Sequence, residues 1–340
     1  MSVQVATERA SSLPWGLVTS DPGLLDRVRT GLAEVEDLLT HCADSDHPLI
    51  REAAGHLVAA GGKRFRPLLT LVAAEFGEPG VAQVTVAGCV VELTHLATLY
   101  HDDVMDEAAL RRGVPTANAR WDNTIAILTG DYLFAKASML LADLGPEAVR
   151  LQAATFERLV TGQINECVDP DPDETAIEHY LRVLEDKTGS LIATSARFGA
   201  LLSGAGPTVV EQLTRFGETF GVAFQLADDI IDIVGASEQS GKLPGTDLRE
   251  GVPTLPTLYA LASTDQESAR LRELLAAPIE DDALIVEALA ALRTHAAMDQ
   301  ARATTRRYAD EARSMLDGLP DIPARDALYA LCDLVHSRMV

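Results

Sequence analysis

Apolar residues recur at the three- and four-residue spacing of an α-helix along almost the whole of this 340-residue chain. Glycine or proline marks the breaks between the periodic segments, as at Gly61-Gly62 and Gly145-Pro146. We find no alternation of apolar and polar residues of the kind that is typical of β-strands. Hydrophobic residues make up 47% of the chain but aromatic residues only 5%, so the core would consist mainly of Ala, Leu and Val. This composition favours helix, and we expect an all-α protein.

The periodic segments follow one another closely enough to form one large helical bundle. We expect a single domain at residues 21–340, preceded by a loosely ordered N-terminus at residues 1–20. The expected helices cover residues 22–42, 48–60, 66–76, 81–109, 123–143, 146–168, 175–203, 207–235, 253–264, 266–276, 283–293, 294–316 and 323–338.

The charge of the chain limits its partners. A net charge of -23 argues against nucleic acid and against an anionic membrane surface. No run of about 18 uninterrupted apolar residues predicts a membrane span, and no basic segment leads into an apolar one at the N-terminus. The four cysteines are far apart and form no CxxC pair, so we expect free thiols in a cytoplasmic protein.

An acidic motif that occurs twice is the most informative local feature. DDVMD begins at Asp102 and DDIID begins at Asp228, and both lie in apolar helical segments. The first and last aspartates of each motif are one helical turn, roughly 6 Å, apart and face the same way. A single acidic arc is most often a solvent-exposed face. Two copies with no Lys or Arg on the same arc are hard to explain in that way, because exposed faces usually mix charges of both signs.

Paired carboxylates on two helices are suited to a hard divalent cation. Mg²⁺ prefers oxygen ligands and shares its coordination sphere with water and phosphate. Zinc is disfavoured because no His or Cys stands at ligand spacing. Two acidic clusters that face each other across a cavity could therefore hold several Mg²⁺ ions, and these ions could hold a diphosphate.

Basic motifs lie beside glycines or beside the acidic motifs. GGKRFRP occupies residues 61–67, Arg111-Arg112 follow the first acidic motif, and Lys187 and Lys242 lie in EDKTGSL and SGKLPGTDLREG. Each could be an ordinary surface charge when it is taken alone. Together, in so anionic a chain, they indicate a site for phosphorylated substrates.

The order and wording of these motifs resemble the trans-isoprenyl diphosphate synthases, the polyprenyl synthetase family, and in particular its medium- and long-chain members. GGKRFRP, HDDVMDEAALRRG, the GQ pair at Gly162, the KT pair at Lys187, FQLADDIID and GKLPGTDLREG carry the resemblance over roughly residues 50–260. The resemblance implies the isoprenoid synthase fold, a helical bundle around a central cavity, and a homodimer. It also implies a Mg²⁺-dependent prenyltransferase that condenses isopentenyl diphosphate head-to-tail with an allylic prenyl diphosphate.

The resemblance also implies a role for each matching residue. About three Mg²⁺ ions would bridge the allylic diphosphate to six aspartates: Asp102, Asp103, Asp106, Asp228, Asp229 and Asp232. The same diphosphate would be contacted by Arg111, Lys187 and Lys242, with Thr188 and Gln225 alongside. The diphosphate of isopentenyl diphosphate would be bound by Lys63, Arg66, His95 and Arg112, in a loop shaped by Gly62. Many family members carry a second lysine where this chain has Val252, so one diphosphate contact is missing or is supplied elsewhere.

The length of the product depends on what lies behind the first acidic motif. In the family a bulky aromatic at the fourth or fifth position before the first aspartate stops chain growth, and here these positions are Thr98 and Ala97. Residues 90–102 span roughly 18 Å as a helix, which leaves room for several isoprene units. We expect an all-trans product beyond 20 carbons, with about 35 to 50 carbons favoured. Phe134, on a neighbouring helix, could also limit the chain length of the product.

Three alternatives remain. A geranylgeranyl diphosphate synthase would stop at 20 carbons. A class I terpene cyclase shares the fold and the first motif, but normally replaces the second DDxxD and lacks the isopentenyl diphosphate site. A non-catalytic synthase subunit tends to lose aspartates, whereas this chain keeps all six.

Overall fold

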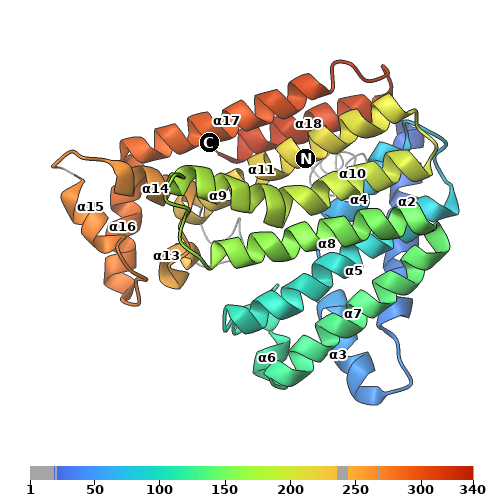
Figure 1. Ribbon diagram of the computed structural model, residues 1–340, viewed down its shortest axis with the longest axis horizontal. Coiled ribbons are helices and arrows are strands. Elements are labelled where there is room, and N and C mark those ends of the chain that lie inside the picture. Colours follow the sequence, from blue (N-terminus) through green and yellow to red (C-terminus); the bar gives the residue numbers. More distant parts are fainter. Residues whose placement is uncertain (1–18, 20, 236–243, 267, 340) are drawn as a thin grey trace, which may run out of the picture. The chain divides into compact units, whose positions relative to one another are not determined.

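The computed structural model describes residues 19, 21–235, 244–266 and 268–339, and helices dominate it (Figure 1). The expected N-terminal segment 1–20 lies outside the described residues, apart from Thr19. The helices are α2 (Pro22–Ala43), α3 (Pro48–Ala59), α4 (Phe65–Ala74), α5 (Ala82–Met105), α6 (Ala117–Arg120), α7 (Asn123–Leu144), α8 (Pro146–Glu166), α9 (Ala176–Leu184), the π-helix η2 (Glu185–Gly189), α10 (Ser190–Leu202), α11 (Pro207–Val234), α13 (Thr246–Glu250), α14 (Leu255–Ala262), α15 (Ala269–Leu274), α16 (Asp282–Thr294), α17 (Ala296–Met315) and α18 (Pro323–Arg338). The all-α prediction is confirmed.

Local sequence signals explain where several helices begin. The carboxylate of Asp21 accepts from the amide of Gly23 at 2.7 Å, with Pro22 in the first turn of α2. Thr175 and Glu178 form a reciprocal capping box at the start of α9. The expected helix 175–203 is present as α9, η2 and α10 in direct succession, with one π-helical turn that periodicity did not reveal.

The chain divides into two compact units. Unit 1 comprises the described residues up to Phe156, together with Leu191–Gly217 and Met315–Leu331. Unit 2 comprises the described residues within Glu157–Ser190, Glu218–Ser314 and Cys332–Val340. The expectation of one domain at residues 21–340 stays a prediction.

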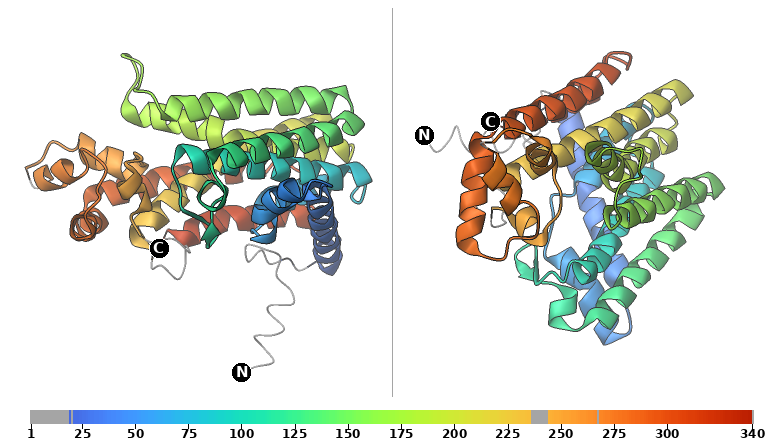
Figure 2. Two further views of the ribbon diagram at one scale, coloured as in Figure 1. Left: turned by 90° about the horizontal axis from the view of Figure 1, so that it is seen from below. Right: turned by 60° about the vertical axis from the view of Figure 1, so that its left-hand side comes forward.

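Helix α5 is the centre of unit 1. It packs against α2, α4 and α7, and it lies beside α7 in Figures 1 and 2. Val91, Leu93 and Leu96 point to different sides of α5, and all three are fully buried. A helix that is covered on most sides is apolar nearly all round, which explains its weak amphipathic pattern.

In unit 2, α14 packs against α9, α15 and α16. The second half of α11 contributes Ala227 and Ile230, which are fully buried, and Leu255 of α14 is almost fully buried. These residues hold the second acidic motif on a helix whose other sides are covered.

A short antiparallel hairpin follows α5, where a helix to residue 109 was expected. Its strands are β1 (Leu110–Arg111) and β2 (Val114–Pro115), with Leu110 opposite Pro115. The helix stops at Met105 because side-chain contacts replace helical hydrogen bonds there. The Asn118 amide donates to the backbone carbonyls of Asp103 and Ala108 at 3.1 and 3.2 Å. Two-residue strands are too short to show an alternating pattern.

By length and composition alone, two helices of the described chain could cross a membrane, α5 and α7. The most apolar window of α5 is 61% buried, as expected of a core helix, whereas that of α7 is only 33% buried. Helix α7 therefore presents an apolar face that unit 1 does not cover.

Candidate functional site

The first acidic motif lies at the C-terminal end of α5. The amide of Asp106 donates to the carbonyl of Asp102 at 2.8 Å, so the one-turn spacing is kept although the helix ends inside the motif. Asp103 is fully buried and Asp106 is exposed. Carboxylates at this end of a helix meet the negative pole of its dipole, which destabilises each by about 0.3–1 kcal/mol. Three of them together require positive charge nearby.

Arg111 on β1 supplies part of that charge. Its Nε lies 2.7 Å from Oδ1 of Asp103. Burial raises the pKa of the Asp103 carboxyl, and the Arg111 guanidinium opposes that rise. Among the described residues, the buried Oδ2 atom of Asp103 has no hydrogen-bond partner. A buried carboxylate oxygen without a partner fits a metal ligand, since an unsatisfied acceptor is otherwise costly.

The turn of the hairpin carries Arg112 and Gly113, both with positive φ, at 54° and 78°. Two such residues are typical of a type I′ turn, and a non-glycine residue there costs about 1–3 kcal/mol of strain. The strain directs the Arg112 guanidinium to the C-terminal end of α3, where Nη1 donates to the carbonyls of Leu57, at 3.1 Å, and Gly61. A Cβ on Gly62 would lie 3.0 Å from Cζ of Arg112, so glycine permits this close approach.

Positive charges gather around His95. Burial, and then the positive charges of Arg66 and Arg112, hold the pKa of the His95 imidazole well below its usual value. Burial also lowers the pKa of Arg66 to about 10, and its buried Nε has no hydrogen-bond partner in the described part of the chain. Lys63 is exposed in the loop before α4. Unit 1 thus brings together Gly62, Arg66, His95 and Arg112, four of the five residues expected at the isopentenyl diphosphate site.

Arg64, the remaining cation of GGKRFRP, forms ion pairs within the protein. Its side chain is buried and pairs with Glu36 at 2.7 Å and with Glu92 at 3.0 Å. It also has a positive φ of 45° at the start of α4. The sequence placed Arg64 within a basic cluster, but its glutamate partners lie on α2 and α5 and anchor the loop. This pairing leaves Lys63 and Arg66 as the two cations of GGKRFRP that could reach a ligand.

The second acidic motif lies in the last two turns of α11, in unit 2. Asp229 is buried, and it accepts hydrogen bonds from the hydroxyl of Tyr180 on α9 and from the amide of Gln225 at 3.0 Å. Burial raises the pKa of Asp229 to about 6, although both donors oppose the rise. Gln225 also accepts a long hydrogen bond, 3.5 Å, from Thr188. Three predicted residues, Thr188, Gln225 and Asp229, therefore form one hydrogen-bonded chain.

The other two aspartates of this motif have partners from later segments. Asp232 accepts from the backbone amides of Thr246 and Asp247 at 3.3 and 3.2 Å, at the start of α13. Oδ1 of Asp228 lies 2.7 Å from Nη2 of Arg338 near the C-terminus. Neither Tyr180 nor Arg338 was predicted from the sequence. Tyr180 precedes Lys187 by two helical turns, which could have indicated it, but nothing in the motifs pointed to Arg338.

Lys187 lies in the π-helical turn η2 and forms an ion pair with Glu166 on α8. Helix α8 and η2 meet at Gly162, where a Cβ would lie 2.7 Å from the backbone nitrogen of Lys187. This contact explains the glycine of the GQ pair in steric terms. Lys242 lies outside the described residues.

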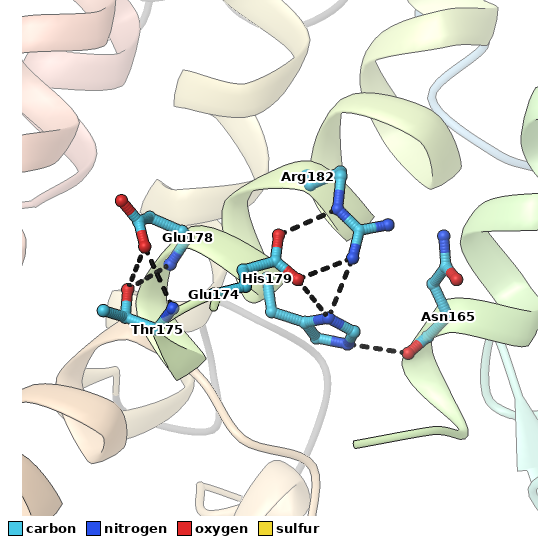
Figure 3. Close-up of polar contacts among 6 residues, drawn as sticks. All are labelled: Asn165, Glu174, Thr175, Glu178, His179 and Arg182. Carbon is cyan, nitrogen blue, oxygen red and sulfur yellow. Dashed lines mark hydrogen bonds and ion pairs between the residues drawn. The ribbon is translucent and has the colours of Figure 1, made fainter. Parts of the chain in front are cut away.

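The loop between α8 and α9 is held by a polar cluster (Figure 3). Glu174 accepts from Arg182 at 2.7 and 2.9 Å and lies 3.1 Å from Nδ1 of His179. Nε2 of His179 lies 2.8 Å from the carbonyl oxygen of Asn165. The cluster fixes the start of α9, the helix that carries Tyr180 to Asp229.

The expected chain-length residues lie one and a half turns before the first motif. Ala97 is fully buried, whereas Thr98 is half-buried and its hydroxyl donates to the carbonyl of His95 at 2.9 Å. Phe134 on α7 stacks with Phe156 on α8 at 4.3 Å between ring centroids. Phe134, the residue of α7 that could also limit chain growth, is therefore part of an aromatic pair with Phe156.

Within the described part of the chain, no three His, Cys, Asp or Glu side chains converge closely enough to hold a metal ion by themselves. Each motif nevertheless has the donors that Mg²⁺ prefers, and Mg²⁺ usually completes its shell with water and phosphate. The aspartates of each motif, taken separately, therefore fit an ion that arrives with a diphosphate: Asp102, Asp103 and Asp106 in unit 1, and Asp228, Asp229 and Asp232 in unit 2.

The chain is similar to known proteins over nearly its whole length. The family model described as Polyprenyl synthetase matches residues 47–292. A nonaprenyl diphosphate synthase from Mycobacterium tuberculosis is 53% identical over 325 residues, which cover 95% of this chain and 97% of that protein.

Solved structures give the same result. The structure of geranylgeranyl pyrophosphate synthase from Corynebacterium glutamicum, complexed with calcium and isoprenyl diphosphate, has a TM-score of 0.84 and 45% identity. That match covers 94% of this chain and 99% of the other. A decaprenyl diphosphate synthase from Rhodobacter capsulatus has a TM-score of 0.83 and 35% identity, over 93% and 98% of the two chains. With its helical fold, its two acidic motifs and the cations beside them, the chain belongs to the polyprenyl synthetase family and is a prenyltransferase enzyme.

Proposed function

We propose that the protein condenses isopentenyl diphosphate head-to-tail with an allylic prenyl diphosphate, in a Mg²⁺-dependent reaction that yields an all-trans polyprenyl diphosphate. The observation that carries this proposal is that acidic and cationic side chains lie close together in unit 1. Arg111 pairs with Asp103, while Arg112 and Arg66 lie close enough to lower the pKa of His95. One helix end thus offers carboxylates for a metal-bound diphosphate and, beside them, cations for a second diphosphate.

The residues of this chain have distinct tasks in the reaction. Bound Mg²⁺, with about three ions per site, supplies positive charge that stabilises the departing diphosphate. Arg111, Lys187 and Lys242 would donate to the same diphosphate as its C–O bond breaks, with Thr188 and Gln225 alongside. Arg66, Arg112 and the exposed Lys63 hold isopentenyl diphosphate so that its double bond faces the allylic carbocation. The new C–C bond forms, and a proton leaves for the released diphosphate.

His95 has the properties of a neutral donor in this site. Its lowered pKa keeps the imidazole uncharged at neutral pH, so one ring nitrogen can donate a hydrogen bond to a phosphate oxygen. A neutral imidazole adds less electrostatic repulsion to the surrounding arginines than another positive charge would. Exclusion of water by the apolar walls of α5 protects the carbocation.

A product of about 35 to 50 carbons is favoured because small side chains continue behind the first motif. Ala97 and Thr98 place no aromatic ring there, and the relative at 53% identity is named a nonaprenyl diphosphate synthase. A product of about 20 carbons is the alternative, and the name of the Corynebacterium glutamicum enzyme supports it.

Incubation of the purified protein with isopentenyl diphosphate, an allylic primer and Mg²⁺ tests the reaction. The expected product is an elongated prenyl diphosphate that disappears when EDTA replaces Mg²⁺. A released hydrocarbon would instead identify a terpene cyclase. Product formation only after addition of a second, different chain would identify a non-catalytic subunit. Chromatography of the dephosphorylated product gives the chain length.

Replacement of Thr98 by phenylalanine tests the path of chain growth. Thr98→Phe is expected to shorten the main product by several isoprene units while the first condensation continues, because the ring would block the path close to the first motif. Thr40→Phe, at an exposed position of α2, is the control and should leave the product unchanged. An unaltered product from Thr98→Phe would show that the chain grows along another path.

The same proposal includes a cytoplasmic homodimer. Helix α7 exposes Ile127, Leu128 and Met139, at 43%, 58% and 67%. These side chains lie on the helix that unit 1 leaves largely uncovered, so a second copy of the chain is the proposed partner. Light scattering should give the mass of a dimer for the wild type and of a monomer for Met139→Glu. Val286→Glu, at an equally exposed valine of α16, is the control and should remain dimeric.

A further inference from the structure

We infer that Arg338, in the last turn of α18, is a positioning residue for Asp228 of the second acidic motif. The inference rests on the proposed function, because it takes Asp228 to be a ligand of the metal that holds the allylic diphosphate. The basic motifs of the sequence end long before Arg338, so this cation adds a segment to the site that none of those motifs contains.

The guanidinium of Arg338 lies against one face of α11. Its Nη2 is 2.7 Å from Oδ1 of Asp228, and its Cζ is 5.1 Å from the centroid of the Phe224 ring. Phe224 and Asp228 are one helical turn apart, so the planar group is held by a ring at one end and by a carboxylate at the other. The exposed fractions of the two charged side chains are 22% and 38%. This partial burial reduces screening relative to a surface ion pair.

The end of the chain is itself anchored in unit 2. Nε of Arg302 on α17 donates to the carbonyl of Met339 at 3.3 Å. Nε2 of His336 lies 3.4 Å from Oδ1 of Asp310, also on α17. These two contacts flank Arg338 and limit the directions that its side chain can take. A cation in the last turn also complements the negative pole of α18.

The second motif needs such a partner for an electrostatic reason. Asp228, Asp229 and Asp232 repel one another, and they stand at the C-terminal end of α11, where the helix dipole disfavours negative charge. Tyr180 and Gln225 orient Asp229, and backbone amides orient Asp232. Arg338 contacts Asp228 in the same way and brings a full positive charge to the motif.

Orientation by Arg338 is compatible with metal binding. A carboxylate offers about four lone-pair sites on two oxygens, so the ion pair with arginine at Oδ1 can orient the side chain without using its full capacity as a ligand. Partners that orient metal ligands are typically worth 10–100-fold in metal affinity or activity. We therefore expect loss of Arg338 to weaken binding of the metal and diphosphate. The opposite result, tighter binding, is expected only if Arg338 competes with the metal for Asp228.

Calorimetric titration of the full-length protein with inorganic pyrophosphate in excess Mg²⁺ tests the inference, in parallel with steady-state kinetics. Arg338→Gln is expected to weaken pyrophosphate binding about tenfold and to lower kcat by a similar factor. KM for isopentenyl diphosphate should stay within about twofold, because its proposed ligands lie in unit 1. Arg338→Lys should show an intermediate loss of about threefold, since lysine lacks the planar fork.

Arg313→Gln is the matched control. Arg313 is on α17 and pairs at 2.9 Å with Asp333, which is on α18 as Arg338 is. Neither residue belongs to the acidic motif. This variant should bind pyrophosphate as the wild type does. The double variant Arg338→Gln with Asp228→Asn should lose no more kcat/KM than Asp228→Asn alone, because Arg338 acts through Asp228.

Three outcomes would overturn the inference. The first is a folded Arg338→Gln variant that binds pyrophosphate as tightly as the wild type does. The second is a variant that binds pyrophosphate more tightly, which would mean that Arg338 competes with the metal. If Arg338→Gln does not fold, an Arg338→Lys variant with unchanged binding would overturn it as well. Failure of the wild type itself to condense substrates or to bind Mg²⁺–pyrophosphate would instead overturn the proposed function, so the two failures are distinguishable.

Discussion

The two acidic motifs share a pattern and a place at the C-terminal end of a long helix, but their partners come from different distances along the chain. Asp103 is paired with Arg111, only eight residues later, on the hairpin that follows the same helix. Asp229 is held by Tyr180, 49 residues earlier, and Asp228 by Arg338 near the C-terminus. The charge pairing of the first motif is therefore local, whereas the second motif depends on partners brought in by tertiary packing.

The kind of partner differs as well as its distance. Asp103 and Asp229 are both buried, and burial raises the pKa of each. Asp103 has a guanidinium in contact, but the donors to Asp229 are a phenol and an amide, both neutral. Neutral donors stabilise a carboxylate less than a charged donor does. The charged form of Asp229 is thus less well stabilised by its direct partners than that of Asp103.

Removal of one aspartate from each motif should give the largest effect. Asp102→Ala and Asp228→Ala are each expected to lower kcat/KM by about 10³-fold or more, because each removes a proposed ligand of the diphosphate-bound metal. Steady-state kinetics with saturating Mg²⁺ measures this loss. Asp333→Asn, which removes an exposed carboxylate of α18, is the control and should change kcat/KM less than about twofold. Near-wild-type turnover by either alanine variant would remove that motif from the mechanism.

Removal of the cation from the first motif should come next. Arg111→Gln leaves the buried Asp103 without its ion pair and is expected to cost about 3 kcal/mol of stability and about 100-fold in kcat/KM. Denaturant unfolding and kinetics measure the two effects. Arg51→Gln, which breaks an exposed pair with Asp44, should cost less than about 1 kcal/mol. Equal stabilities of the two variants would mean that the Asp103 pair is no more than a surface contact.

The pH dependence of stability should separate the second motif from the first. The pKa of Asp229 is raised from 3.8 to about 6 in the folded protein, so the native state binds the proton more tightly than the unfolded state does. Stability from this group is full below about pH 4 and is lost as the pH rises to about 6, by about 3 kcal/mol in total.

Asp229→Asn isolates that effect because asparagine does not titrate. In EDTA, the stability of Asp229→Asn relative to the wild type should grow between about pH 4 and pH 7 and then level off. Chemical unfolding at a series of pH values measures the difference. A difference that stays flat over this range would mean that Asp229 is already ionised without metal at low pH.

The sequence predicted more of the fold and of the first site than of the second. Helical periodicity placed the major helices within a few residues because long apolar repeats are decided locally. The hairpin at β1 and β2 escaped prediction because contacts of Asn118 accompany the end of α5 and the turn places Arg112 at a positive φ. Those contacts have no counterpart in the periodicity of the chain.

The repeated pattern identified the candidate ligands but not the side chains that contact them. The aspartates of both motifs could be named from a repeated pattern. Tyr180 looked like an ordinary core residue of α9, and Arg338 like an ordinary basic residue at a helix end. Arg64 was the opposite case, since it stood in a basic motif but is bound to Glu36 and Glu92. Which cation meets which carboxylate is set by packing, and one sequence does not contain that information.

The smallest predicted effect tests the tertiary dependence of the second motif most directly. Tyr180→Phe removes one hydroxyl and keeps the ring in its buried place, so Asp229 loses a hydrogen bond without a cavity being formed. We expect kcat/KM to fall about tenfold, with a rise of the pKa of Asp229 above its wild-type value because a donor that lowers it is gone. The onset of Mg²⁺-dependent activity should therefore move to higher pH, whereas Tyr259→Phe, which breaks a hydrogen bond to Thr304 elsewhere in unit 2, should leave it in place. If Tyr180→Phe lowers only the melting temperature and the pH profile stays fixed, the hydroxyl stabilises α9 without orienting Asp229, and the second motif would be as self-contained as the first.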